Sequence, residues 1–393
     1  MVGTTILKNV LNQLNRLSRW AFIFGLYRTC IFIECAIYGC MNRKSNTLIH
    51  YLSDEFTKHV GHIAVGIGIR AKMAQMNKSI YQYEIIKDSN LPNSILLDYF
   101  AFPSRRMTTA DKKFILNKHW RNVERIGAVS SIDGTQSLYQ AISQTESAWE
   151  ANGKPPLLKI EDNHCEIAYA FLSSFGFSPM DKFVAIHVRH SLDIHSQGRN
   201  ADIEEFVKVI HKITSSGKWV IRLGDEFMPR LGEIEGLIDL TQIKFRPEAV
   251  DLFALATCEF MIGTQSGPST VPQLFGKPVI WSNATALGII PWFSKTLVLP
   301  KLIWDAKKKH KFEILELLDS RLSKSDEIPP FYRDRYKWID TQAEDILKAI
   351  DELTSNRTVQ DQSLQFLFDE KRRGIVDYRA PDISPNFLRN NLR

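Results

Sequence analysis

The segment FVAIHVRHSLDIHSQGRN, residues 183–200, places three histidines, two arginines and an aspartate directly after an apolar run. Its metal-capable side chains are His187, His190, Asp193 and His195. A metal site is disfavoured because Arg189, which is always cationic, would lie beside any bound dication. The guanidinium of Arg189 presents a rigid fork of donors that suits a phosphate group. The cluster therefore predicts an anion site rather than a metal centre, although a surface salt bridge would also explain Arg189.

A second candidate anion site is the segment GTQSGPST, residues 263–270. It offers Thr264, Ser266 and Gly267 just before a predicted helix start, where backbone N–H groups and the helix dipole favour an anion. An ordinary helix cap would use the same residue types. Arg189 and the Ser266–Gly267 turn could together grip a diphosphate. The chain has no Walker-type lysine loop and no GxGxxG after a strand, which argues against P-loop kinases and simple dinucleotide dehydrogenases.

Four further residues are candidates for donor binding. His187 shares the strand face of Arg189. Asp225 follows the apolar run WVIRLG and either accepts hydrogen bonds from a base or ribose or caps a helix. Arg222, inside that run, either reaches the ligand or pairs with a helix carboxylate. Asn283 ends the run KPVIWSN.

The elements that carry these residues alternate regularly from residue 181. Apolar runs predict strands at 183–188, 219–224, 259–264 and 277–283, and helical spacing predicts helices at 202–216 and 248–258. Asp202 is the expected N-cap of the first helix, and Gly217 ends it. This spacing predicts right-handed crossovers and a parallel sheet. Ligands of such sheets bind beyond the carboxyl ends of the strands, where the candidate residues lie.

The first half of the chain alternates more weakly. We expect strands at YEII, residues 83–86, and at SILLDYFAF, residues 94–102, and a loop at residues 151–160 because of two adjacent prolines. A loop with Gly61 and His62 leads into an apolar, helical segment. His62 is either a core or loop histidine or a catalytic residue.

The length of 393 residues is too great for one ordinary core and suits two domains. We place a basic amphipathic segment at 1–41, a Rossmann-like N-terminal domain at 42–170, a Rossmann-like C-terminal domain at 171–350, and a tail at 351–393 that packs back on the N-terminal domain. The first segment either lies in a membrane interface or packs on the N-terminal domain. Arg28 and Glu34 interrupt its apolar text, which argues against a spanning helix.

Composition narrows the class of protein. The net charge of +6 gives no case for a nucleic-acid binder and suits contact with an anionic membrane or anionic substrates. The five cysteines are odd in number and lack zinc spacing, so reduced thiols in a cytosolic protein are expected.

Two peptides carry a resemblance to a known family. IHVRHSLD is similar to the H-x-R-x-x-D peptide of the fucosyltransferase-like glycosyltransferases, the α-1,6- and protein O-fucosyltransferase group. CEFMIGTQSGPSTVPQLFGKPVI resembles the later strand-and-serine peptide of that group and the GT-SG-P peptide of heptosyltransferases. The resemblance covers residues 183–283 and looks like a bacterial branch of glycosyltransferases.

The resemblance implies an α/β fold of GT-B type, in which two Rossmann-like domains face a cleft. It also implies that Arg189 binds the distal phosphate of the donor, that Ser266 and Gly267 hold the pyrophosphate, and that Asp225 lies near the nucleoside. An inverting transfer needs a base for the acceptor hydroxyl. The candidates for that base are His62, Asp193 and His195.

We therefore expect a metal-independent, inverting glycosyltransferase without a cofactor. It would transfer a sugar from a nucleotide-diphosphate sugar to a glycan or lipid-linked acceptor in surface polysaccharide synthesis. Its expected location is cytoplasmic, peripheral on the inner face of the cytoplasmic membrane. The alternatives are a non-catalytic nucleotide- or sugar-binding partner subunit and a nucleotide-sugar epimerase of the same architecture.

Overall fold

The computed structural model describes most of the chain after residue 48: residues 49–77, 82–87, 94–100, 104–106, 123–131, 134–192, 197–355 and 362–392. The basic segment at 1–41 and two of the three candidate bases, Asp193 and His195, lie outside the described residues. Within the described residues, no helix combines the length and apolarity that a membrane crossing requires.

The C-terminal domain is built on a seven-stranded sheet in the order β16-β12-β11-β10-β7-β8-β9, with every neighbouring pair parallel. Its central strands are buried along their whole length, as expected when helices cover both faces. The strands are β7 (Phe183–His187), β8 (Trp219–Arg222), β9 (Leu237–Asp239), β10 (Met261–Thr264), β11 (Val279–Ala284), β12 (Thr296–Pro300) and β16 (Asp382–Ile383).

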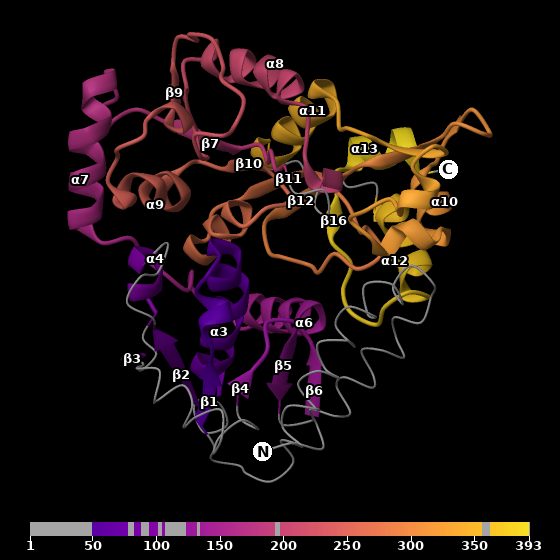
Figure 1. Ribbon diagram of the computed structural model, residues 1–393, viewed down its shortest axis with the longest axis horizontal. Helices are drawn as coiled ribbons and strands as arrows, with labels where there is room; N and C mark the ends of the chain where they lie inside the picture. The colour runs from indigo at the N-terminus through magenta and orange to yellow at the C-terminus, as the bar shows by residue number, and fades with distance from the viewer. Residues whose placement is uncertain are drawn as a thin grey trace.

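Two layers of helices enclose this sheet (Figure 1). Helices α8 (Ile203–Thr214) and α11 (Ala343–Thr354) contribute to one apolar core, and α7 (Asp162–Leu172) and α9 (Glu248–Thr257) to the other. As predicted, Asp202 caps α8, because its side chain accepts a hydrogen bond from the Glu204 N–H at 3.0 Å. The four strands and two helices predicted between residues 183 and 283 are confirmed.

The N-terminal domain has a four-stranded parallel sheet in the order β3-β2-β1-β4 and a separate antiparallel hairpin, β5–β6. Its strands are β1 (Ile49–Leu52), β2 (Gln82–Lys87), β3 (Ser104–Arg106), β4 (Val123–Glu124), β5 (Ala128–Ser131) and β6 (Gly134–Ser137). Its helices are α3 (Gly68–Met76), which continues the π-helical turn η2 (His62–Ile67), α4 (Ser94–Asp98) and α6 (Leu138–Ala151). The chain is thus an α/β protein of two Rossmann-like domains.

One prediction for this domain is confirmed and one is wrong. Residues 83–86 form part of β2 as expected. The strand predicted from Ser94 begins instead as helix α4. Leu96, Leu97 and Phe100 are all buried, and their spacing of one and three residues places them on one side of a helix that packs against α9. The apolar run is too short for its period to separate a strand from a buried helix.

The remaining elements lie beside the C-terminal sheet. A three-stranded antiparallel sheet consists of β13 (Leu302–Asp305), β14 (His310–Lys311) and β15 (Tyr336–Ile339). The other elements of this region are α10 (Ile314–Asp319), the 3-10 turn η9 (Arg321–Lys324), α12 (Gln362–Arg373) and α13 (Pro385–Asn391). The tail adds β16 to the edge of the C-terminal sheet, beside β12. It also contacts the N-terminal domain, since the Ser143 hydroxyl of α6 donates to the Arg379 carbonyl at 3.1 Å.

The two domains touch backbone to backbone at a pair of glycines. A Cβ atom added to Gly61 would lie 2.8 Å from the Cα atom of Gly267, and one added to Gly267 would lie 2.8 Å from the Gly61 nitrogen. Only glycine leaves room for this approach. The contact brings the start of η2 against the start of the 3-10 turn η7 (Pro268–Thr270).

Candidate functional site

A cleft of about 1000 Å³ lies between the two domains around this glycine contact. Three cationic side chains line it: Lys58 from the N-terminal domain, and Arg189 and Arg199 from the C-terminal domain. No carboxylate belongs to the described residues that line it. Because three cationic side chains line one concave surface, the cleft favours anionic ligands.

Arg189 and the Ser266–Gly267 turn meet at one edge of the sheet. Strands β7 and β10 are parallel neighbours, with His187 beside Gly263, so the residues that follow the two strands emerge together. The Arg189 backbone N–H donates to the Thr264 hydroxyl at 2.9 Å. Arg189, Ser266 and Gly267 all line the cleft. Gly267 is also the N-cap of η7, so the start of that turn faces the cleft.

His187, the last residue of β7, contacts the Ser266 side chain. Its Nδ1 lies 2.9 Å from the Ser266 hydroxyl oxygen, and that hydroxyl donates to the Thr264 carbonyl at 3.2 Å. Burial, followed by the charges of Arg189 and Arg222, lowers the pKa of His187 to about 4. The imidazole is therefore neutral at neutral pH, and because Ser266 is only 6% exposed, this neutral hydrogen bond fixes the direction of its hydroxyl.

The loop that follows Arg189 is closed at its base by Asn200. The Asn200 side chain accepts from the Ser191 N–H at 2.9 Å and donates to the Ser191 carbonyl at 2.7 Å. The buried Lys301 ammonium donates to the Asn200 carbonyl and, at 2.7 Å, to Asp340. This clamp positions Arg199, which lines the cleft and lies 3.3 Å from Asp326. Asp193 and His195 lie outside the described residues.

On the opposite wall, the first turn of η2 presents His62. Its Nδ1 lies 2.9 Å from the Glu55 carbonyl, which can only accept, so Nδ1 carries the proton and Nε2 is the basic nitrogen. The ring of His59 lies edge-on at 5.0 Å between centroids. Burial, His62 and Lys58 lower the pKa of His59. His59, His62 and Lys58 all line the cleft that Arg189 also lines.

Three predicted donor-binding residues do not line the cleft. Arg222 is fully buried and pairs with Asp239 at 2.8 Å. Asp225 is exposed, and its side chain accepts from the Phe227 N–H at 3.0 Å. Asn283 sits at an irregularity of β11 with φ of +54°, and its side chain accepts from the Thr341 N–H at 3.0 Å.

Thr264 is also buried, beneath the cleft, where its hydroxyl receives the Arg189 N–H. Its carbonyl accepts from the Ser269 hydroxyl at 2.7 Å and from Trp281 Nε1 at 3.0 Å. Thr264 and His187 therefore hold the residues that line the cleft rather than lining it themselves.

Sequence reasoning missed the apolar half of the cleft. It includes Trp281 and a segment that we call the wall loop, residues 286–293, which contributes Ile289, Ile290, Pro291 and Phe293. The rings of Trp281 and Phe293 meet edge-to-face at 5.9 Å. The only sequence signal was an apolar GIIPWF directly after the fourth predicted strand. Such a surface suits a planar or apolar part of a ligand beside its anionic part.

The described residues contain no group of three or more His, Cys, Asp or Glu side chains that could hold a metal ion.

Comparisons with known proteins give likenesses in structure. No protein-family model matches the chain, and no curated protein matches it. The structure is similar to a glycosyl transferase family 9 protein from Veillonella parvula, with a TM-score of 0.46, 12% identity, and coverage of 79% of this chain and 98% of that chain. It is similar to ADP-heptose heptosyltransferase II of E. coli, with a TM-score of 0.41, 9% identity, and coverage of 65% and 91%. For E. coli heptosyltransferase WaaC with ADP the TM-score is 0.38, the identity 12%, and the coverage 78% and 98%. The assignment of a two-domain fold rests on the strand order and the cleft of this chain itself.

Proposed function

We propose that this protein is a metal-independent glycosyltransferase that binds a nucleotide-diphosphate sugar in the cleft. One observation carries the proposal: Arg189 and the Ser266–Gly267 turn, on neighbouring strand ends, line the same cleft, and no described carboxylate lines it. A leaving nucleoside diphosphate accumulates negative charge as the sugar departs. A fixed guanidinium and oriented N–H groups stabilise that charge in place of a metal ion.

His62 is the base in this proposal. In this proposal His62 Nε2 takes the proton of an acceptor hydroxyl, and because His62 and the diphosphate grip belong to different domains, the leaving group stays on the other wall. Attack from the face opposite the departing diphosphate inverts the anomeric centre. The apolar wall formed by Trp281 and the wall loop offers room for a lipid-linked or glycan acceptor or for the base of the donor.

The place of this activity follows from the same proposal. A basic amphipathic segment at 1–41 would hold the enzyme at the inner face of the cytoplasmic membrane, where lipid-linked glycans are available. Surface polysaccharide synthesis would use such an acceptor. Vesicle flotation of the full chain, with and without anionic lipid, tests this part separately from catalysis.

The decisive experiment is nucleotide binding by Arg189→Ala protein. Isothermal titration with ADP, UDP and GDP identifies the base, and we expect Arg189→Ala to weaken the preferred diphosphate about 100-fold, because a charge-assisted bidentate bond is lost. Arg230→Ala, which removes an exposed arginine outside the cleft lining, is the matched control and should leave binding unchanged. Equal affinities of wild-type and Arg189→Ala protein for every diphosphate would refute the proposal.

Product analysis separates the alternatives. Hydrolysis or transfer of the sugar from a radiolabelled donor, lost in His62→Gln protein, supports the glycosyltransferase. Formation of an epimeric sugar without an added acceptor would instead identify an epimerase. Diphosphate binding without turnover across donors and acceptors would identify a non-catalytic partner subunit.

A further inference from the structure

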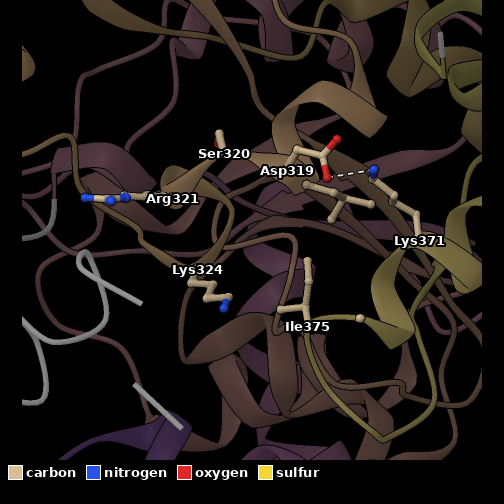
Figure 2. A pocket seen from close by; sticks show the side chains of 8 residues that line it. Asp319, Ser320, Arg321, Lys324, Lys371 and Ile375 are labelled. Atoms are coloured by element: carbon tan, nitrogen blue, oxygen red, sulfur yellow. Dashed lines mark ion pairs between the residues drawn. The ribbon is translucent and has the colours of Figure 1, made fainter. Parts of the chain in front are cut away.

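A second cavity, of about 410 Å³, lies between the end of α10, the turn η9 and the end of α12. We call it the basic pocket, because three cations and one carboxylate line it: Arg321, Lys324, Lys371 and Asp319. Leu318 and Ile375 give it an apolar side. Figure 2 shows Asp319 and Lys371 meeting on one side of this pocket, with Lys324 and Ile375 below them and Arg321 extending away from all four.

The single carboxylate of the pocket shows where an anion would bind. Asp319 lies 2.6 Å from the Lys371 ammonium, but their side chains are 65% and 37% exposed. An ion pair as exposed as this contributes little to stability. A ligand with two or more negative charges that also reaches Lys324 can therefore replace Asp319 on Lys371.

We propose that the basic pocket is a binding site for a small phosphorylated molecule. Lys324 and Lys371 both line the pocket, and a phosphate group suits such ammonium groups. The cavity is larger than one phosphate group needs. The remaining space, beside Leu318 and Ile375, accommodates the organic part of a phosphomonoester.

Elements on both sides of the basic pocket are hydrogen-bonded to the wall loop of the cleft. The Gly288 N–H donates to the Ser323 carbonyl of η9 at 2.7 Å, and the Ala286 N–H donates to the Ser325 carbonyl at 3.2 Å. On the other side, Arg372, which follows Lys371, donates to the Ile290 carbonyl. A ligand that joins η9 to the end of α12 thus fixes both supports of a loop that lines the cleft.

Pyrophosphate titration of the full chain carrying Arg189→Ala tests the site, because that substitution weakens the grip in the cleft. We expect one remaining saturable site, and its affinity should fall about tenfold in the additional Lys371→Gln variant. Lys337→Gln, which removes an exposed lysine on β15 outside the pocket, is the matched control and should not change the affinity. No binding at all, or equal losses in the two variants, overturns the proposal.

Substitution of Asp319 should change the affinity for pyrophosphate in the opposite direction. Asp319→Asn removes the competitor for Lys371, so we expect pyrophosphate to bind about threefold to tenfold more tightly. Asp334→Asn makes the same change in net charge at an exposed residue outside the pocket. Equal gains in both variants would indicate general attraction to a basic surface and would refute a defined site.

Hydrogen exchange tests the link to the cleft without relying on its function. Saturating pyrophosphate should slow amide exchange in residues 286–293 of Arg189→Ala protein, and Lys371→Gln should abolish that protection. Unchanged exchange with the site filled would overturn the link. Failure of nucleotides to bind the wild-type cleft would count against the proposed function alone, because these measurements use neither nucleotide nor turnover.

Discussion

His187 shows how one buried residue can set the chemistry of a cleft. Its imidazole is 5% exposed, lies 2.9 Å from the Ser266 hydroxyl and stays neutral because burial and two arginines oppose a third positive charge. A neutral imidazole orients the hydroxyl without adding charge to a site that Arg189 already makes cationic. His187 is therefore a positioning residue, and its titration should be visible in stability.

Stability should fall with pH through the titration of His187. Its pKa is about 4 in the folded protein against an ordinary value of 6.5, so the unfolded chain binds more protons between those pH values. Stability is fully present above pH 6.5 and decreases as the pH falls towards 4, by up to about 3 kcal/mol. His187→Asn, which can keep the bond to Ser266, should remove this component from denaturant unfolding curves. An unchanged pH dependence in that variant would contradict the assignment.

At the scale of elements, the helix start at Gly61 and the turn at Gly267 form a close backbone contact between the two domains. Each begins at a residue without a side-chain cap, and the two beginnings touch across the domain boundary. At the first start the His62 and Ile63 N–H groups donate to the His59 carbonyl at 2.9 and 3.1 Å, so this contact acts on the site through the positions of the two backbones. The close approach places both starts at the cleft that holds Arg189.

Gly61→Ala should therefore weaken diphosphate binding. The new methyl group would meet backbone of Gly267 at 2.8 Å, and relief of such overpacking costs about 1–3 kcal/mol, equivalent to about tenfold or more in affinity. Titration calorimetry measures the loss. Gly127→Ala is the control, because Gly127 also lines the cleft but a Cβ there meets nothing within 4 Å. Equal affinities of the two variants would show that the glycine contact does not shape the site.

For the whole molecule, the C-terminal strap, residues 372–382, ties the wall loop to the sheet (Figure 1). The buried Arg372 donates to the Ile290 carbonyl, and the Tyr378 hydroxyl donates to the Ile289 carbonyl at 2.7 Å. The Arg379 guanidinium lies 3.6 Å over the Trp292 ring. The strap then ends in β16, so the last part of the chain extends the sheet and supports the loop that forms one wall of the cleft.

Arg372→Met should destabilise the protein while Arg373→Met should not. Arg372 is 1% exposed and serves the Tyr378 and Ile290 carbonyls, so its loss leaves buried acceptors unpaired, at about 2–4 kcal/mol in the free energy of unfolding. Arg373 is exposed and pairs only with nearby Glu370 among the described residues. Urea unfolding compares the two, and similar midpoints would show that the strap does not support the fold.

Some predicted donor-binding residues do not line the cleft, for a specific reason. Arg222 and Asp225 are candidates because they sit in or after a strand, as Arg189 does, and each also has a structural alternative. Arg222 instead pairs with Asp239 on β9, a strand that the sequence did not predict. Arg199 and Lys58 line the cleft, but neither follows a strand of the sheet directly, so strand position alone did not single them out.

The sequence by itself determined the parallel sheet and the shared edge of Arg189 and Ser266. Apolar periodicity is a local property, and the carboxyl ends of parallel neighbouring strands must emerge together. Only the tertiary structure decided which polar side chains reach the cleft, that its lining is cationic on both walls, and that the tail supports one of them. Those facts depend on partners more than 50 residues apart, such as Gly61 with Gly267, and no local pattern encodes such a contact.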